Sequence, residues 1–195
     1  MFKRTKGYFL LTMLVLTGFA GRMHSNILTT KERHMLVTEL KTSRNDFLKT
    51  VEGLSSKQFD FKANKKELSI KEYIYKLVSM ENNLWEAAQA SLKQEISTVK
   101  NTFPDEALIS LAQQQKMLQN NIKFKTVKEA LKFYKNERSE MLKYVHTSTE
   151  NVRGHIAQIS MGNFDVYQLM LLNTIYSKYY TQQIEQIKTH SNFPK

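Results

Sequence analysis

The chain has 195 residues, with 29 Lys and Arg against 18 Asp and Glu, which gives a net charge of +11. This length suits one domain with a sizeable core. The absence of cysteine excludes a disulfide framework, a cysteine nucleophile and a bacterial lipoprotein anchor. Lysines lie among glutamates along the chain, as in Lys31-Glu32-Arg33, with no arginine-rich block. This pattern predicts a solvated basic surface and no nucleic-acid partner.

Residues 1–20 have the pattern of a secretory signal peptide. Two lysines and an arginine lie within the first six residues, an apolar run of about thirteen residues follows, and small Gly18 and Ala20 precede a plausible cleavage site. The run is shorter than the roughly twenty residues that span a bilayer. An uncleaved anchor and an amphipathic first helix are the alternatives. We expect export to the periplasm or extracellular space, cleavage near Ala20, only transient membrane contact through the leader, and a linker over 21–28.

Two long helices are predicted next, the first from near Thr29 and the second from Ser69. Both residues have a glutamate three positions later, which is the spacing of a capping box. Gly53 indicates the end of the first helix. Apolar residues recur at helical spacing in both: Leu36, Leu40, Phe47, Val51 and Leu54, with Ser43 in a gap, and then Ile70, Ile74, Leu77, Leu84, Ala88 and Leu92.

Two more long helices are predicted after residues 95–126, a segment that gives no clear prediction. Thr126 has a glutamate at capping-box spacing and begins the third helix, which frays near Gly154. The fourth runs from about Val166 to Lys188, and residues 189–195 form a tail. We expect an all-α four-helix bundle with a core that includes Leu40, Phe47, Ile74, Leu84, Leu131, Leu142, Leu169 and Ile184.

Two stretches resemble motifs of a known family. Residues 68–77 read L-S-I-K-E-Y-I-Y-K-L, and residues 176–184 read Y-S-K-Y-Y-T-Q-Q-I. They are similar to W-S-I-x-E-x-x-x-H-L and H-x-x-R-H-x-x-Q-I of the DinB-like and thiol-transferase-like superfamily. Residues 54–58, L-S-S-K-Q, resemble that family's L-S-x-x-Q turn. The resemblance covers roughly residues 29–188. It implies an up-down-down-up bundle with a long crossover between the second and third helices.

The resemblance also implies a metal site, because three histidines of those motifs bind one divalent metal. At their positions this chain has Lys76, Tyr176 and Tyr180. A protonated lysine has no lone pair to offer, and a tyrosine phenol needs a strong electrostatic drive to ionise. We therefore expect a divergent member without the ligand histidines: no metal, no cofactor and no catalytic residue at this site.

The candidate site consists of Lys76, Tyr176 and Tyr180, with Asn173 and Arg138 as neighbours. Spacing of three and four residues places Asn173 and both tyrosines on one helix face. Arg138 stands where the third helix expects an apolar residue. Two interpretations stay open. Lys76 and Arg138 would bind an anionic group of a small molecule, or the five residues form a polar network that fills the former metal cavity.

Three functions from different classes are compatible with the sequence. The first is an exported, non-catalytic DinB-like protein that binds an unknown small molecule or partner. The second is an enzyme of the same fold, of the thiol-transferase or metal-dependent hydrolase type. The third is a structural homodimer without a ligand. The histidines do not separate them, since His34, His146 and His155 have no second ligand at metal spacing and are expected on the surface.

Overall fold

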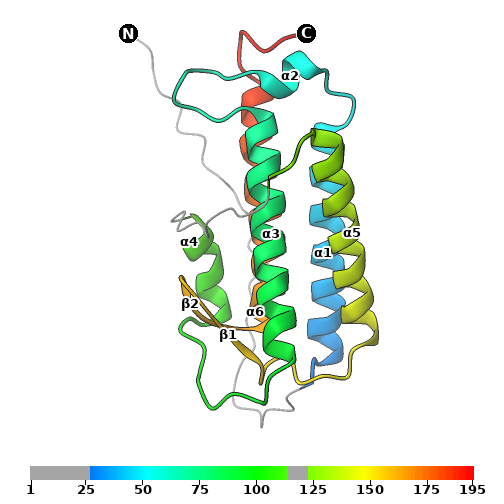
Figure 1. Ribbon diagram of the computed structural model, residues 1–195, viewed down its shortest axis with the longest axis vertical. Coiled ribbons are helices and arrows are strands. Elements are labelled where there is room, and N and C mark those ends of the chain that lie inside the picture. The colour runs from blue at the N-terminus through cyan, green and yellow to red at the C-terminus, as the bar shows by residue number, and fades with distance from the viewer. Residues whose placement is uncertain (1–26, 114–122) are drawn as a thin grey trace.

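The computed structural model describes residues 27–113 and 123–195 (Figure 1). The predicted signal peptide lies outside the described residues, and so does the predicted linker except for Ile27 and Leu28. None of the helices in the two described ranges combines the length and hydrophobicity needed to cross a membrane.

Four long helices form the body of the molecule: α1 (Thr30–Val51), α3 (Ile70–Leu92), α5 (Val127–Thr147) and α6 (Val166–Lys188). In Figure 1, α1 and α6 run in one direction, and α3 and α5 run in the other. Helices α1 and α3 each pack against both α5 and α6. The four therefore form a square in which α1 lies diagonal to α3 and α5 lies diagonal to α6. The predicted four-helix bundle is confirmed.

The helix starts follow from local hydrogen bonds. The capping boxes predicted at Thr29 and Ser69 are present, with the side-chain oxygen accepting from the backbone N–H three residues later and the glutamate accepting from the cap residue's own N–H. At Thr126 the prediction is half right. The Thr126 hydroxyl caps Glu129 N, but the Glu129 carboxylate accepts from the N–H of Lys125.

The connection between α1 and α3 contains a short helix, α2 (Ser56–Asp60). Gly53 adopts φ 72°, a left-handed conformation that glycine enters without a side-chain penalty, and it follows the last turn of α1. Ser55 and Gln58 form a capping box at the start of α2. The L-S-x-x-Q pattern is therefore a helix end followed by a capped turn.

The long connection from α3 to α5 contains the 3-10 turn η1 (Asp105–Ala107) and helix α4 (Leu108–Gln113), which packs on α6. Because α3 and α5 point the same way, the chain must return along the bundle between them. The described parts of this segment do so on the α6 side (Figure 1).

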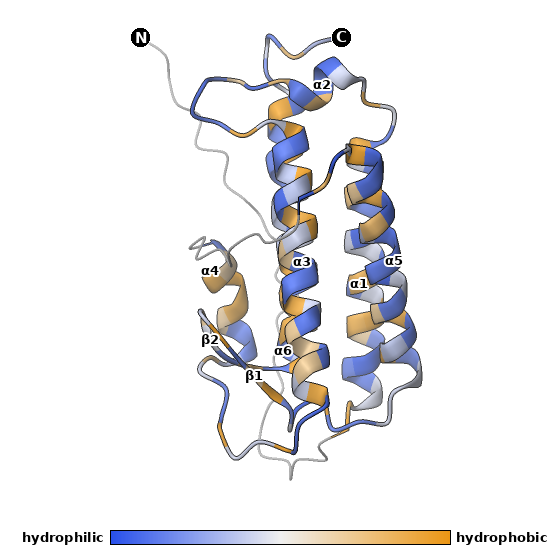
Figure 2. Ribbon diagram, viewed as in Figure 1, coloured by the Kyte–Doolittle hydropathy of each residue, from blue (hydrophilic) through white to orange (hydrophobic). Residues whose placement is uncertain are grey.

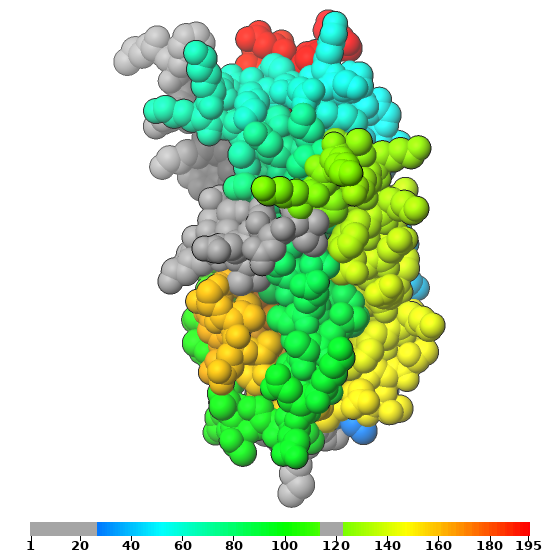
Figure 3. Space-filling view, viewed as in Figure 1, coloured from blue at the N-terminus to red at the C-terminus, as the bar shows by residue number. Residues whose placement is uncertain are grey.

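A β-hairpin between α5 and α6 was not predicted. Strands β1 (Ile156–Ile159) and β2 (Gly162–Asp165) pair antiparallel, and α5 ends at Thr147 rather than near Gly154. Gly162 has φ 137°, and a Cβ there would lie 2.9 Å from the Thr102 hydroxyl. The hairpin thus depends on close packing against a distant segment. Figure 3 shows it in orange, lying along α3 in green.

The core lies on the inward stripes of the four helices, and Figure 2 shows their mixed apolar and polar surfaces. Seven of the eight predicted core residues are buried: Leu40, Phe47, Ile74, Leu84, Leu142, Leu169 and Ile184. The prediction for Leu131 is wrong in degree, because this side chain is only half-buried at the edge of the core. The helical periodicity therefore identified the buried faces.

Candidate functional site

The three positions that align with the metal ligands of the DinB-like motifs lie on α3 and α6, which pack against each other. Tyr176 and Tyr180 occupy successive turns of α6, and their side chains are 2% and 3% exposed. Lys76 is half-buried on α3. It lies one turn after Tyr73, whose ring centroid is 5.8 Å from that of Tyr180. The α3–α6 contact therefore brings this part of α3 close to Tyr180.

Burial raises the pKa of both tyrosines above the ordinary value of 10. It raises the pKa of Tyr176 to about 12, and it raises the pKa of Tyr180 further, with additional repulsion from Tyr176, Tyr179 and Tyr73. Both phenols are therefore protonated at neutral pH. The Tyr176 hydroxyl points to the sulfur of Met161, at 3.6 Å. Protonated phenols and an ammonium group are not a donor set that binds a divalent metal.

Arg138 and Asn173 meet in the bundle interior, but Arg138 already has an anionic partner. Its Nε and Nη2 donate to the two carboxylate oxygens of Glu81 at 2.7 and 2.6 Å, and Nη2 also donates to the Asn173 carbonyl oxygen at 2.9 Å. Arg138 and Glu81 are 0% and 1% exposed. Glu81 thus occupies the position that the sequence interpretation gave to an anionic group of a ligand.

Further contacts between α5 and α6 show that this network lies near the bundle axis. The Tyr134 hydroxyl is 2.9 Å from the Ser177 hydroxyl, and these two helices are diagonal to each other. Two buried atoms of the network, Arg138 Nη1 and Asn173 Oδ1, have no hydrogen-bond partner within the described part of the chain. Nη1 is a hydrogen-bond donor and Oδ1 is an acceptor.

The sequence analysis did not identify Glu81, although the position of this residue in the apolar stripe of α3 indicates a buried charge. The inward stripe of α3 passes from Leu77 to Leu84, and Glu81 occupies the helical position between them. The stripe of α5 has the same kind of gap at Arg138. Opposite charges in two facing apolar stripes predict a buried ion pair, since a single buried charge is strongly unfavourable.

A second polar cluster, also missed, surrounds Arg153 at the end of the bundle where α1 and α6 begin. Arg153 donates to Glu32, Asp105 and Asp165 at 2.8–3.1 Å, and its guanidinium lies 3.9 Å from the ring centroid of Tyr167. The three carboxylates come from segments far apart in the sequence. Because one guanidinium donates hydrogen bonds to all three carboxylates, the cluster fastens η1 and the start of α6 to α1.

The prediction of surface histidines holds for two of three. His34 and His146 are exposed, but His155 is only 7% exposed. Its Nδ1 lies 3.1 Å from the carbonyl oxygen of Ser91 near the end of α3. The histidine is buried because the hairpin that follows it packs onto α3.

Comparison with known proteins supports the fold. No protein-family model and no curated protein sequence matches the chain. Among solved structures the chain is similar to YfiT from Bacillus subtilis, described as "a probable metal-dependent hydrolase with an unusual four-helix bundle topology". The TM-score is 0.62 at 12% sequence identity, over 92% of this chain and 97% of that chain. At this identity the likeness concerns the fold alone, and the chain has the four-helix-bundle fold of that structure.

Proposed function

We propose that this protein is an exported, non-catalytic DinB-like protein that binds a small polar or anionic molecule between α3 and α6 without a metal ion. The observation that carries the proposal is the identity of the side chains at the three metal-ligand positions. Lys76 supplies a positive charge, and Tyr176 and Tyr180 supply two protonated hydroxyl groups. Such a set binds carboxylate or phosphate oxygens rather than a cation.

The interior network supports a polar ligand. Asn173 lies one turn before Tyr176 on α6, and its Oδ1 and the neighbouring Arg138 Nη1 lack partners within the described residues. Because Glu81 neutralises the charge of Arg138, Lys76 is the cation that this proposal assigns to the ligand. Lys76 is also the more exposed of the site residues, so the ligand would enter from the surface of α3.

The test is native mass spectrometry, together with metal analysis, of protein purified from its own exported fraction. The proposal expects a bound small molecule and less than stoichiometric metal. A Tyr176→Phe/Tyr180→Phe variant should lose the molecule, because phenylalanine keeps the packing and removes both hydroxyls. Tyr179→Phe, the same change at a half-buried neighbour on α6, is the matched control and should keep it. Stoichiometric metal that disappears in Tyr180→Phe would overturn the proposal and favour the hydrolase alternative.

A further inference from the structure

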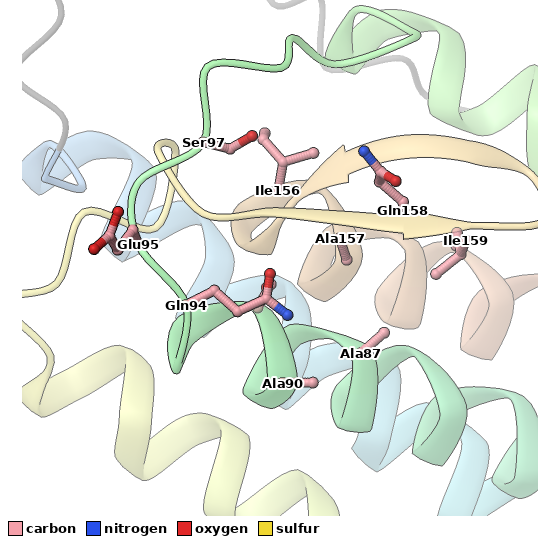
Figure 4. Close-up of a pocket in the computed structure, with 10 residues that line it drawn as sticks. Ala87, Ala90, Gln94, Glu95, Ser97, Ile156, Ala157, Gln158 and Ile159 are labelled. Atoms are coloured by element: carbon pink, nitrogen blue, oxygen red, sulfur yellow. The ribbon is translucent and has the colours of Figure 1, made fainter.

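A groove separates β1 from the last turns of α3, and its lining does not include Lys76, Tyr176 or Tyr180. It has a volume of about 510 Å³, and its lining comes from three segments: Ala87, Ala90 and Ser91 of α3, residues 94, 95 and 97 of the following loop, and all four residues of β1. Figure 4 shows the lining side chains extending from Glu95 and Ser97 at one end to Ala87 and Ile159 at the other. Successive side chains of a strand point to opposite faces, so a space that touches four consecutive residues follows the strand's edge.

The two edges of the hairpin differ in the partners of their backbone groups. On β2, Asn163 N donates to the Thr102 hydroxyl at 2.8 Å, and Thr102 N donates to Asn163 O at 2.9 Å. The backbone groups of Asn163 therefore point away from β1. In an antiparallel pair the cross-strand partner of such a residue also points outward. That partner is Gln158, and the same alternation turns Ile156 outward.

The outward edge of β1 faces the groove. The described segments of the chain provide no backbone partner for the N–H and C=O groups of Ile156 or Gln158. An edge of this kind is a template for an added strand. Ala87 and Ala90 leave room opposite it, since larger side chains at these two positions would fill the space.

We propose that this groove binds an extended peptide segment of a partner protein, which adds as an antiparallel strand to β1. The wall formed by α3 favours a single extended chain over the folded edge of a second copy. Side chains of the peptide that face Ala87 and Ala90 must be small. Glu95 is the charged residue among those that line the groove, and it lies at the end near Ile156, so the carboxyl-terminal side of an antiparallel peptide should carry a basic residue.

The rim of the groove also has the character of an interaction surface. Ile96 and Val99 are 58% and 39% exposed, and with Ile27 they are the large apolar side chains that the described residues leave open to solvent. Ile96 lies between two residues that line the groove. Exposed apolar side chains beside unpaired backbone groups are typical of a peptide-binding edge.

The probe is the capped hexapeptide acetyl-Thr-Ala-Thr-Ala-Thr-Lys-amide, titrated into the full chain and observed by NMR. We expect saturable shifts of the Ile156 and Gln158 amide signals and slower hydrogen exchange at both. An added strand uses alternate amides of the peptide. We therefore compare two modified peptides, one N-methylated at both alanines and the other N-methylated at the second and third threonines. One of them should bind to β1 and the other should not. No saturable shift, or equal tolerance of the two versions, would overturn the proposal.

Protein variants test the location. Ala90→Leu should fill the groove and weaken binding by about tenfold or more, whereas Gln89→Leu, at an exposed position of the same helix, should not. Gln158→Pro removes an outward N–H that the hairpin does not use, so it should abolish binding while the melting temperature stays close to that of the parent. Unchanged affinity in Ala90→Leu and Gln158→Pro would contradict the proposal. Tyr176→Phe/Tyr180→Phe should bind the peptide normally, which separates this site from the proposed small-molecule site.

Discussion

Arg138 and Glu81 form a two-point ion pair inside the bundle, with hydrogen bonds of 2.7 and 2.6 Å and almost no exposure to solvent. It joins α5 to α3 at the level where Arg138 also reaches the Asn173 carbonyl of α6. Burial raises the pKa of the Glu81 carboxyl, and attraction from the guanidinium opposes that shift. Removing either partner leaves the other charge without compensation in a region of low dielectric constant.

The first prediction concerns this pair. Glu81→Gln and Arg138→Met should each lower the free energy of unfolding by about 3–5 kcal/mol. The double variant should cost clearly less than the sum of the two, because it leaves no unpaired charge. Urea unfolding of the four proteins in a double-mutant cycle measures this coupling. The same cycle on Asp60 and Lys71, a solvent-exposed ion pair, is the control and should show little coupling. Additive costs at Glu81 and Arg138 would contradict the prediction.

The second prediction concerns the pH dependence of stability. Glu137 of α5 is half-buried, and its Oε2 has no hydrogen-bond partner in the described ranges. Burial, with repulsion from Glu140, Glu86 and Glu81, raises its pKa from 4.5 to about 7. The folded protein therefore binds this proton more tightly than the unfolded chain does. The resulting stabilisation is full below about pH 4.5 and is lost as the pH rises through about 7.

Glu137→Gln should remove this dependence, since an amide does not titrate. Its melting temperature should exceed that of the parent at pH 8, and the difference should shrink or reverse at pH 5. Thermal unfolding across this range gives the comparison, with exposed Glu52→Gln as the matched control. If the melting temperatures of the parent and of Glu137→Gln change with pH in the same way from pH 5 to pH 8, the Glu137 carboxyl does not titrate in this range.

The third prediction concerns the three positions that align with the metal ligands of the DinB-like motifs. Lys76→His, Tyr176→His and Tyr180→His together should create zinc or nickel affinity, because α3 and α6 would bring three imidazoles together. Isothermal titration calorimetry on the parent and the triple variant measures the gain. A control triple variant with Tyr179→His in place of Tyr180→His moves one ring about 100° around α6 and should not bind. Equal metal affinity in both triple variants would show that these positions on α3 and α6 do not orient the three imidazole rings toward one metal ion.

The fourth prediction concerns export. Produced in its native host, the full chain should lose about its first twenty residues and leave the cytoplasm, as intact-mass measurement of the exported fraction would show. Leu14→Arg places a charge in the apolar run and should keep the uncleaved chain in the cytoplasm, whereas Thr5→Ser, outside the run, should not. An intact Met1 on soluble cytoplasmic protein would contradict the signal-peptide interpretation.

The sequence by itself determined the helices and most of their ends. Capping residues such as Thr29 and Ser69 act on backbone groups within the same turn, and apolar periodicity depends only on helix geometry. Both are local effects, so the positions of α1, α3 and α6 and seven of the eight expected core residues were predictable. The placement of Lys76 on α3 and of Tyr180 on α6 was predictable for the same reason.

Tertiary structure decided the features that depend on residues distant in the sequence. Glu81 interrupts the apolar face of α3, and Arg138 interrupts the apolar face of α5. Only the packing of α3 against α5 makes these two residues partners. The hairpin has four-residue strands with no strong pattern, and it forms where Thr102 pairs with Asn163 and where β1 lies next to α3. His155 is buried for the same reason. Contacts across 57 to 64 residues of sequence produce these features, and no local rule encodes such contacts.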